Sequence, residues 1–327
     1  MYDIIIIGSG PAGLSAAIYA QRACLDTIVI EKNGISGGQV LNTWEVDNYP
    51  GFPGVTGFEL SRQFREHANK LGARVVQDEV VQVELSGNVK KVVCEEETYE
   101  ARCVILASGA HHRTLEVPGE EELRGAGVSY CATCDGEFFS GKDIFVIGGG
   151  YAAVEEGLFL TRYGKKIMMV VRRDRCSIEN AEVDELKEHP NVEMMFNTEV
   201  VRVEGDSAIR KVVLRNRVTG KETIYTAPEN DFCGVFVFVG YAPENELVKG
   251  KVELDPQGYI ITDRDQKTNI DGVYAAGDIC VKNLRQVVTA VSDGAVAATS
   301  TEQSLGQLYR QLGLQSTYAK RATQEDA

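Results

Sequence analysis

Long apolar runs, basic clusters and paired cysteines are all scarce in this sequence of 327 residues. No apolar run approaches the roughly 20 residues that a membrane-spanning helix needs. The N-terminus, MYDIIIIGSGPAG, has no basic segment ahead of its apolar residues, so we expect no signal or transit peptide and a cytoplasmic protein. The formal net charge is −14 and basic residues do not cluster, which argues against nucleic acid and membrane surfaces as partners.

Cysteine is present but hardly paired. Of the eight cysteines, only Cys131 and Cys134 are closely spaced. A secreted disulfide scaffold would be shorter and denser in cysteine. A structural zinc site needs about four ligands, and the four histidines do not supply the missing ones near Cys131, so we predict no metal site. A lone Cys-x-x-Cys without a signal peptide is instead typical of a redox-active dithiol. We read the other six cysteines as buried small hydrophobes.

The first 31 residues predict a dinucleotide-binding unit. The β-branched run 4–7 is typical of a strand buried on both faces, and the turn GSGPAG follows at 8–13. A helix over 13–23 and a strand over 27–31 complete the unit, ending at Glu31. The glycines allow a pyrophosphate to approach the backbone, and the acid can accept from a ribose hydroxyl. The unit therefore suits a nucleotide with a free ribose, such as FAD.

A second unit repeats this order. A strand over 144–147 is followed by the turn GGGYAA at 148–153, a helix over 151–163 and a strand over 167–171. Two such units predict an α/β protein with two Rossmann-like three-layer domains and two nucleotide sites.

The two units differ after their second strand. The position that matches Glu31 is Val171, and Arg172 and Arg173 follow it. Adjacent arginines can hold a 2′-phosphate that an acid would repel, so the second site favours NADP(H). The alternative is that both arginines belong to a solvated surface turn.

Two further features concern the organisation of the chain. TNIDGVYAAGDIC, residues 268–280, predicts a strand that ends at Gly277-Asp278, and a helix of small residues follows from about residue 290. Polar segments with Pro and Gly at 112–120 and 240–246 are the expected crossings between domains.

These motifs together resemble the low-molecular-weight thioredoxin reductases over about residues 1–312. GSGPAG, GGQ, NYPGF, CATCDG, GGGYAAVEE, FVFVGYAPEN and YAAGDI stand in the order of that family. The resemblance implies a discontinuous FAD-binding domain, 1–115 and 246–315. It also implies an inserted pyridine-nucleotide domain, 116–245, that carries the Cys-x-x-Cys. We expect the last dozen residues, 316–327, to form a C-terminal tail. A homodimer and a thioredoxin-like substrate are implied as well.

The resemblance also implies roles for single residues. Cys131 and Cys134 match the redox pair, and Asp135 matches an acid–base residue, with a simple turn or cap acid as the alternative. The positions implied to hold FAD are Gly8, Ser9, Gly10, Pro11, Ala12, Gly13, Glu31, Lys32, Gly38, Gln39, Asn48, Gly109, Gly277, Asp278, Arg285, Gln286 and Val287. Those implied to hold the pyridine nucleotide are Gly148, Gly150, Ala153, Arg172 and Arg173.

One motif departs from the family. Its NADPH box reads His-Arg-Arg, three residues, Arg, whereas VRRDRCS has Val171 for the His and Ser177 for the last Arg. A subgroup that lacks this signature is reduced by ferredoxin, so the electron donor is NADPH or, alternatively, ferredoxin.

The implied activity is thioredoxin-disulfide reduction. Electrons pass from NADPH through FAD to the dithiol, with Cys134 as the flavin-facing sulfur and Cys131 as the attacking one. One flavin serves both the nicotinamide and the dithiol, which implies rotation of the smaller domain. Two rivals stay open: a dithiol oxidase that passes electrons to oxygen, and a non-catalytic flavin-binding regulator.

Overall fold

The computed structural model describes residues 1–43, 45–179 and 181–313, so the expected tail at 316–327 lies outside the described residues. The chain divides into two compact units. The first comprises Met1–His111 and the chain from Ala242 on, and the second is His112–Tyr241. The short strands β7 (Ala110–His112) and β16 (Tyr241–Pro243) pair where the chain passes between the units. Within the described residues, no helix has the length and apolar character to cross a membrane.

The first unit is built on a mainly parallel sheet. Its strands run in the order β3-β2-β1-β6, with β17 parallel along β6 and the antiparallel pair β5-β4 beyond it. The bounds are β1 (Tyr2–Ile7), β2 (Thr27–Glu31), β3 (Arg74–Gln77), β4 (Val80–Glu84), β5 (Lys90–Cys94), β6 (Thr98–Leu106) and β17 (Val273–Ala275). The predicted strands at 4–7 and 27–31 are therefore confirmed, the first beginning two residues earlier.

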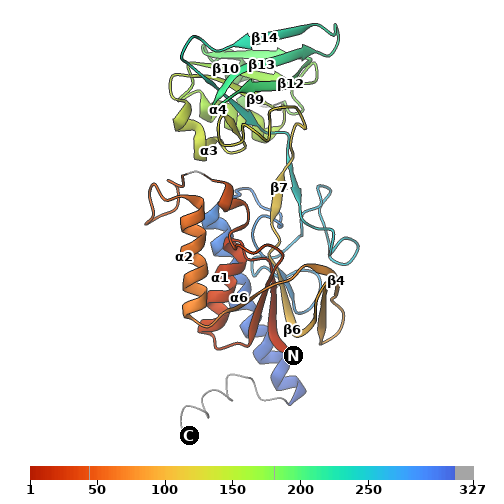
Figure 1. The fold of residues 1–327 in the computed structure, drawn as a ribbon. Helices are drawn as coiled ribbons and strands as arrows, with labels where there is room; N and C mark the ends of the chain where they lie inside the picture. The colour runs from red at the N-terminus through yellow and green to blue at the C-terminus, as the bar shows by residue number, and fades with distance from the viewer. Residues whose placement is uncertain (44, 180, 314–327) are drawn as a thin grey trace. The chain divides into compact units, whose positions relative to one another are not determined.

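Alternating burial along β1 gives the first unit its layers. Ile4 and Ile6 pack with the helices, whereas Ile5 and Ile7 pack into a second core on the other face. The helices are α1 (Pro11–Arg22), α2 (Gly57–Lys70) and α6 (Val287–Leu312), with a short 3-10 helix η1 (Gly38–Asn42). Figure 1 shows α1, α2 and α6 side by side. The run of isoleucines is thus buried on both faces, as predicted.

Helix α6 begins three residues before the predicted start near residue 290. The side chain of Gln286 accepts from the helix's third residue, Thr289, whose hydroxyl accepts from the Gln286 N–H, which forms a capping box. Further along, α6 touches α1 closely, since a Cβ on Gly294 would lie 2.0 Å from the Ala12 carbonyl oxygen. The glycine therefore permits the contact that sets α6 against the first turn of α1.

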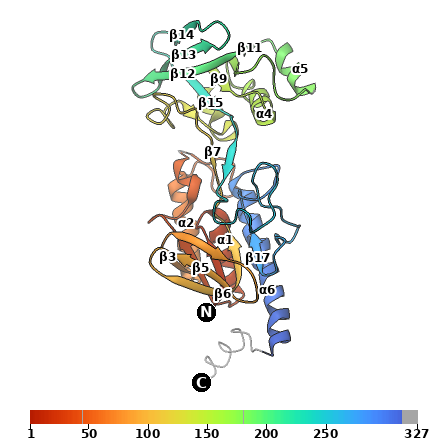
Figure 2. The same cartoon turned by 90° about the vertical axis from the view of Figure 1, so that its right-hand side faces the viewer.

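The second unit repeats the layered arrangement. Its sheet runs β11-β10-β9-β15-β13-β12, with β8 on β15 and β14 on β13, and Figure 2 shows α4 and α5 beside it. The strands are β8 (Val128–Ser129), β9 (Asp143–Ile147), β10 (Lys166–Val171), β11 (Val192–Phe196), β12 (Thr198–Gly205), β13 (Ile209–Asn216), β14 (Glu222–Thr226) and β15 (Cys233–Val237). The helices are α3 (Ala132–Asp135), η2 (Gly136–Phe139), α4 (Tyr151–Leu160) and α5 (Ala181–Glu188). The predicted α/β class with two Rossmann-like units is confirmed.

Two expectations need correction. The helix predicted over 151–163 ends at Leu160, because the backbone N–H groups of Arg162 and Tyr163 donate to carbonyls only three residues back, those of Phe159 and Leu160, and the chain tightens into a turn. Among the six cysteines read as buried, Cys24 is only half-buried, since it stands with a φ of 57° in the turn after α1. The other five are buried.

Candidate active site

The turn between β1 and α1 forms an open backbone cradle. Gly8 has a φ of 100°, and a Cβ there would lie 2.5 Å from the Ala107 carbonyl oxygen. A Cβ on Gly13 would lie 1.9 Å from the Gly8 carbonyl oxygen. Helix α1 then starts with Pro11 and without a side-chain cap. The turn thus presents backbone N–H groups at a helix N-terminus, which suits a pyrophosphate.

Glu31 closes this cradle from the end of β2. Its Oε2 accepts from the backbone N–H of Ser9 at 2.9 Å and from the Ser9 hydroxyl at 2.6 Å. Its Oε1 accepts from the Asn33 N–H at 2.9 Å. The carboxylate therefore lies beside the glycine turn, where the sequence predicts a ribose acid, and the exposed Lys32 follows it.

Several of the other FAD positions lie around the N-terminus of α6. The Asn48 side chain donates to the Gln286 side chain at 3.1 Å, and Val287 is the first residue of α6. The Arg285 guanidinium stacks on the Tyr259 ring at 4.1 Å. The Gln39 side chain donates to the Ala110 carbonyl, close to Gly109, whereas Gly38 stays exposed.

Asp278 provides the test of whether the first unit fits FAD. Its Oδ1 is buried and has no hydrogen-bond partner within the residues that the structure describes. Burial raises the pKa of Asp278, and the nearby cations of Lys282 and Arg285 oppose that rise. A buried acceptor without a donor is costly unless a ligand supplies one. A ribityl hydroxyl would supply it, so the residues present fit the cofactor.

The thiol pair lies in the second unit. Cys131 and Cys134 form a disulfide at the start of α3, and both are half-buried. The Ser129 hydroxyl donates to Asp135 Oδ2 at 2.6 Å and accepts from the Cys131 N–H at 3.1 Å. Burial raises the pKa of Asp135, while the Ser129 hydrogen bond lowers it. A carboxyl group of this kind can hold a proton close to the sulfurs.

The second glycine turn has the same construction as the first. Gly148 has a φ of 144°, and a Cβ there would lie 2.4 Å from the Phe238 carbonyl oxygen. Helix α4 starts after Gly150, again without a side-chain cap, and Ala153 in its first turn is fully buried. The arrangement suits the pyrophosphate of a second nucleotide.

Arg172 and Arg173 follow β10 and are exposed, whereas Val171 points into the core. The hydroxyl of Ser177 donates to the Gly149 carbonyl at 3.0 Å, so the position where the family has an arginine closes the glycine turn instead. The sequence reading missed Arg217, whose guanidinium donates to the Arg172 carbonyl at 3.3 Å. Arg217 stands in the turn after β13, so only the fold brings it there.

Sequence reasoning also missed Glu156 on α4. Its Oε2 is buried without a hydrogen-bond partner among the described residues. Burial, and secondarily the carboxylate of Glu155, raises the pKa of Glu156 to about 7. The motif GGGYAAVEE contains both acids, but the spacing alone does not show which of them turns inward.

The comparisons with known proteins agree with this geometry. The model of the pyridine nucleotide-disulphide oxidoreductase family matches residues 2–294. The thioredoxin reductase of Peptoclostridium acidaminophilum is 48% identical over 93% of this chain and 96% of its own. That of Mycolicibacterium smegmatis is 46% identical over 94% and 97%. The crystal structure of thioredoxin reductase from Streptococcus pyogenes superposes with a TM-score of 0.87 at 40% identity, covering 94% and 99% of the two chains. The chain therefore belongs to the pyridine nucleotide-disulphide oxidoreductases and, within them, to the thioredoxin reductases of the low-molecular-weight type.

Proposed function

We propose that the protein is a thioredoxin-disulfide reductase that passes electrons from NADPH through FAD to Cys131 and Cys134 and then to a thioredoxin-like protein. The observation that carries this proposal is the Cys131–Cys134 disulfide in the unit of the second glycine turn, with a FAD cradle in the first unit. FAD and NADPH are the cofactors of the family. We assign the FAD role to residues 1–115 and 246–315 and the pyridine-nucleotide role to 116–245.

The Cys131–Cys134 pair carries out thiol–disulfide exchange with the protein substrate. When bound, FAD would supply the electron pair for opening the Cys131–Cys134 bond, which leaves two thiolates. The Cys131 thiolate then attacks the substrate disulfide, forms a mixed disulfide and releases one substrate thiolate. Cys134 displaces the second substrate thiolate, so the Cys131–Cys134 disulfide forms again and the substrate leaves as a dithiol. Asp135 gives a proton to one of the two departing substrate thiolates, which its raised pKa permits, and solvent supplies the second proton.

Four groups position the cofactors in this scheme. Gly8 to Gly13 cradle the FAD pyrophosphate, Glu31 binds the adenosine ribose and Asp278 accepts from a FAD hydroxyl. Arg172 and Arg173 hold the 2′-phosphate of NADPH beside the turn at Gly148. Both arginines are exposed, so they are accessible to a ligand. The other assigned residues line these sites through their backbone or through the contacts described above.

Reduced ferredoxin is the second candidate donor. The observation in its favour is that Val171 is buried in the core and the Ser177 hydroxyl donates to the Gly149 carbonyl, so two positions of the family's NADPH box supply no charged donor to a phosphate. An anaerobic titration of the oxidised protein with NADPH, NADH and reduced ferredoxin in turn decides between the donors. Bleaching of the flavin by NADPH supports the proposal. Bleaching by reduced ferredoxin and by neither nucleotide shows that ferredoxin, and not NADPH, is the electron donor.

The substrate assignment has its own test. Turnover of a thioredoxin with consumption of the donor supports a reductase, whereas peroxide release with small dithiols and no thioredoxin turnover indicates a dithiol oxidase. A disulfide that stays closed when the flavin is reduced indicates a regulator. We further propose a homodimer in the cytoplasm, which size-exclusion chromatography with light scattering and cell fractionation test.

A further inference from the structure

A largely buried ion pair lies beside the FAD cradle in the first unit. The Lys282 ammonium nitrogen is 2.5 Å from Asp293 Oδ2, and the two side chains are only 12% and 15% exposed. Buried ion pairs rarely add stability over apolar residues of similar size, because both charges lose their hydration. We therefore look for the role of the Lys282–Asp293 pair in the other contacts that the two side chains make.

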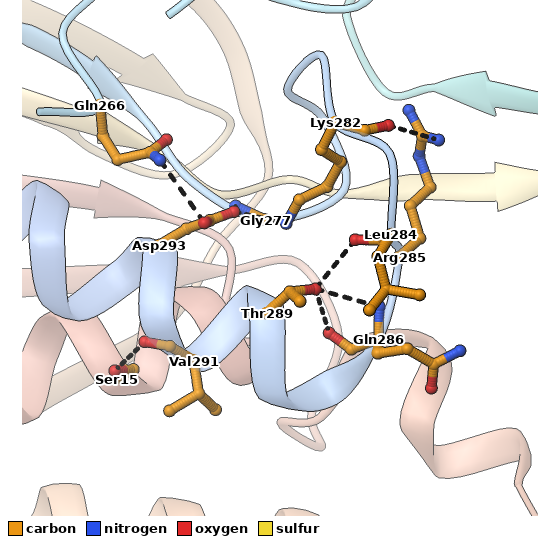
Figure 3. Close-up of polar contacts among 10 residues, drawn as sticks. All are labelled: Ser15, Gln266, Gly277, Lys282, Leu284, Arg285, Gln286, Thr289, Val291 and Asp293. Atoms are coloured by element: carbon orange, nitrogen blue, oxygen red, sulfur yellow. Dashed lines mark hydrogen bonds and ion pairs between the residues drawn. The ribbon is translucent and has the colours of Figure 1, made fainter. Parts of the chain in front are cut away.

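Asp293 also holds the turn after β17. Its Oδ2 accepts from the backbone N–H of Gly277 at 3.1 Å, and its Oδ1 accepts from the Gln266 side chain at 3.5 Å (Figure 3). Gly277 has a φ of 83°, a conformation that few residues other than glycine adopt easily. The carboxylate thus fixes the backbone just before Asp278.

Close packing sets the Lys282–Asp293 pair against the glycine turn at 8–13. A Cβ on Gly277 would lie 2.9 Å from the Cβ of Ala12. Gly294, next to Asp293, packs against the carbonyl of the same Ala12. The turn after β17, the start of α1 and the second turn of α6 therefore meet at one point, where the first unit would bind FAD.

Four charged or titratable groups face Asp278 from these elements. The Lys282 and Arg285 cations favour its ionised form, and the Asp293 carboxylate opposes it. The Cys280 thiol shares the cluster, and burial raises its pKa to about 12, so it stays neutral near pH 7. Lys282 thus forms an ion pair with Asp293 and also lowers the pKa of Asp278, so its charge acts on both carboxylates.

We propose that the Lys282–Asp293 pair is a positioning unit for FAD. Asp293 fixes the Gly277 backbone, and Lys282 supplies the positive charge beside which the Asp278 carboxylate remains an acceptor for a FAD hydroxyl. This inference rests on the FAD site proposed above. Neither residue needs to touch the cofactor.

The test measures release of FAD from the purified holoenzyme on dilution, followed by flavin fluorescence at several pH values between about 6 and 8. Lys282→Met should weaken FAD binding by about tenfold or more at the lower pH. Asp278 is then protonated, and its charge-assisted hydrogen bond with the FAD hydroxyl is lost. The loss should shrink as the pH rises, because Asp278 without its cation binds a proton more readily. Lys282→Arg, which keeps the charge, should restore most of the affinity, and Asp293→Asn should weaken binding as well.

A second background separates positioning from plain stability. With Asp278→Asn in place, Lys282→Met should have little further effect on FAD release, because the carboxylate through which Lys282 acts is gone. The matched control is Lys249→Met, which removes an exposed pair with Glu246 in the same unit. It should release FAD like the parent.

The outcomes are distinct. A parent protein that holds no FAD refutes the proposed cofactor and function. Suppose instead that the parent holds FAD, and that Lys282→Met and Asp293→Asn bind FAD with the affinity and pH profile of the parent. This result overturns the positioning role alone. Equal losses with and without Asp278→Asn also overturn it. If Lys282→Met does not fold, Lys282→Arg decides, since a loss of FAD affinity there despite the retained charge contradicts the inference.

Discussion

Replacing Glu156 with glutamine should stabilise the protein, and only at neutral to alkaline pH. The folded state raises the pKa of this carboxyl group from 4.5 to about 7. The folded protein therefore binds more protons than the unfolded chain between these two values. Stability consequently falls as the pH rises from about 4.5 to about 7, and the loss is complete above that window. Glutamine carries no such titration.

The expected size follows from the same shift. A rise of the pKa from 4.5 to about 7, at about 1.4 kcal/mol for each tenfold change in proton affinity, corresponds to about 3–3.5 kcal/mol. The buried amide of glutamine costs about 1 kcal/mol in return if its donors are not paired. We therefore expect Glu156→Gln to gain about 2 kcal/mol at pH 8.5 and to be neutral or slightly destabilised at pH 5.

The assay is urea unfolding of the FAD-loaded protein at these two pH values. The difference in unfolding free energy between variant and parent should increase by about 2–3 kcal/mol from pH 5 to pH 8.5. Glu155→Gln is the matched control, because Glu155 is exposed and is only the secondary cause of the shift. It should change the difference by a few tenths of a kcal/mol. A Glu156→Gln variant that gains no stability on going to pH 8.5 would refute the reasoning.

Three further predictions address the proposed chemistry. Cys131→Ser and Cys134→Ser should each keep bound FAD, seen in the visible spectrum, but lose thioredoxin reduction; measurable turnover by either would contradict the dithiol's role. Gly8→Ala should lose FAD or fold poorly, since its methyl group would lie 2.5 Å from a carbonyl oxygen at a φ of 100°; normal FAD content would sink this prediction. Arg172→Ala with Arg173→Ala should raise the KM for NADPH by about tenfold, the low end for charge-assisted contacts at an exposed site, and leave the KM for NADH unchanged. An equal rise for both nucleotides would show that the arginines do not read the 2′-phosphate.

The sequence predicted those parts of the fold that depend on local pattern. The run of isoleucines at 4–7 and the glycine turn after it identify a buried strand and a nucleotide turn, because few other structures need that order of residues. The helix ends were less predictable. The start of α6 at Val287 depends on the reciprocal bonds of Gln286 and Thr289, and apolar periodicity does not show such a cap.

Contacts between distant segments were beyond the sequence. Lys282 and Asp293 stand eleven positions apart, and only the packing of α6 on α1 brings Asp293 to the turn at Gly277. Ser129 at the end of β8 meets Asp135 at the end of α3, and Arg217 reaches the Arg172 carbonyl from the turn after β13. These side chains have no motif of their own, since each gains its role from a neighbour that the fold supplies.

The comparison of the two glycine turns shows how one pattern serves different ligands. Both turns have a glycine at positive φ, packed against a neighbouring carbonyl, and a helix without a side-chain cap, which is the part that a pyrophosphate requires. The difference lies at the end of the next strand. Glu31 turns back to Ser9 and offers a carboxylate to a ribose, whereas Val171 turns into the core and leaves the following arginines to face solvent. We therefore propose that nucleotide choice in this chain depends on which way the side chain at the end of the second strand points, and that the glycine motif alone does not determine it.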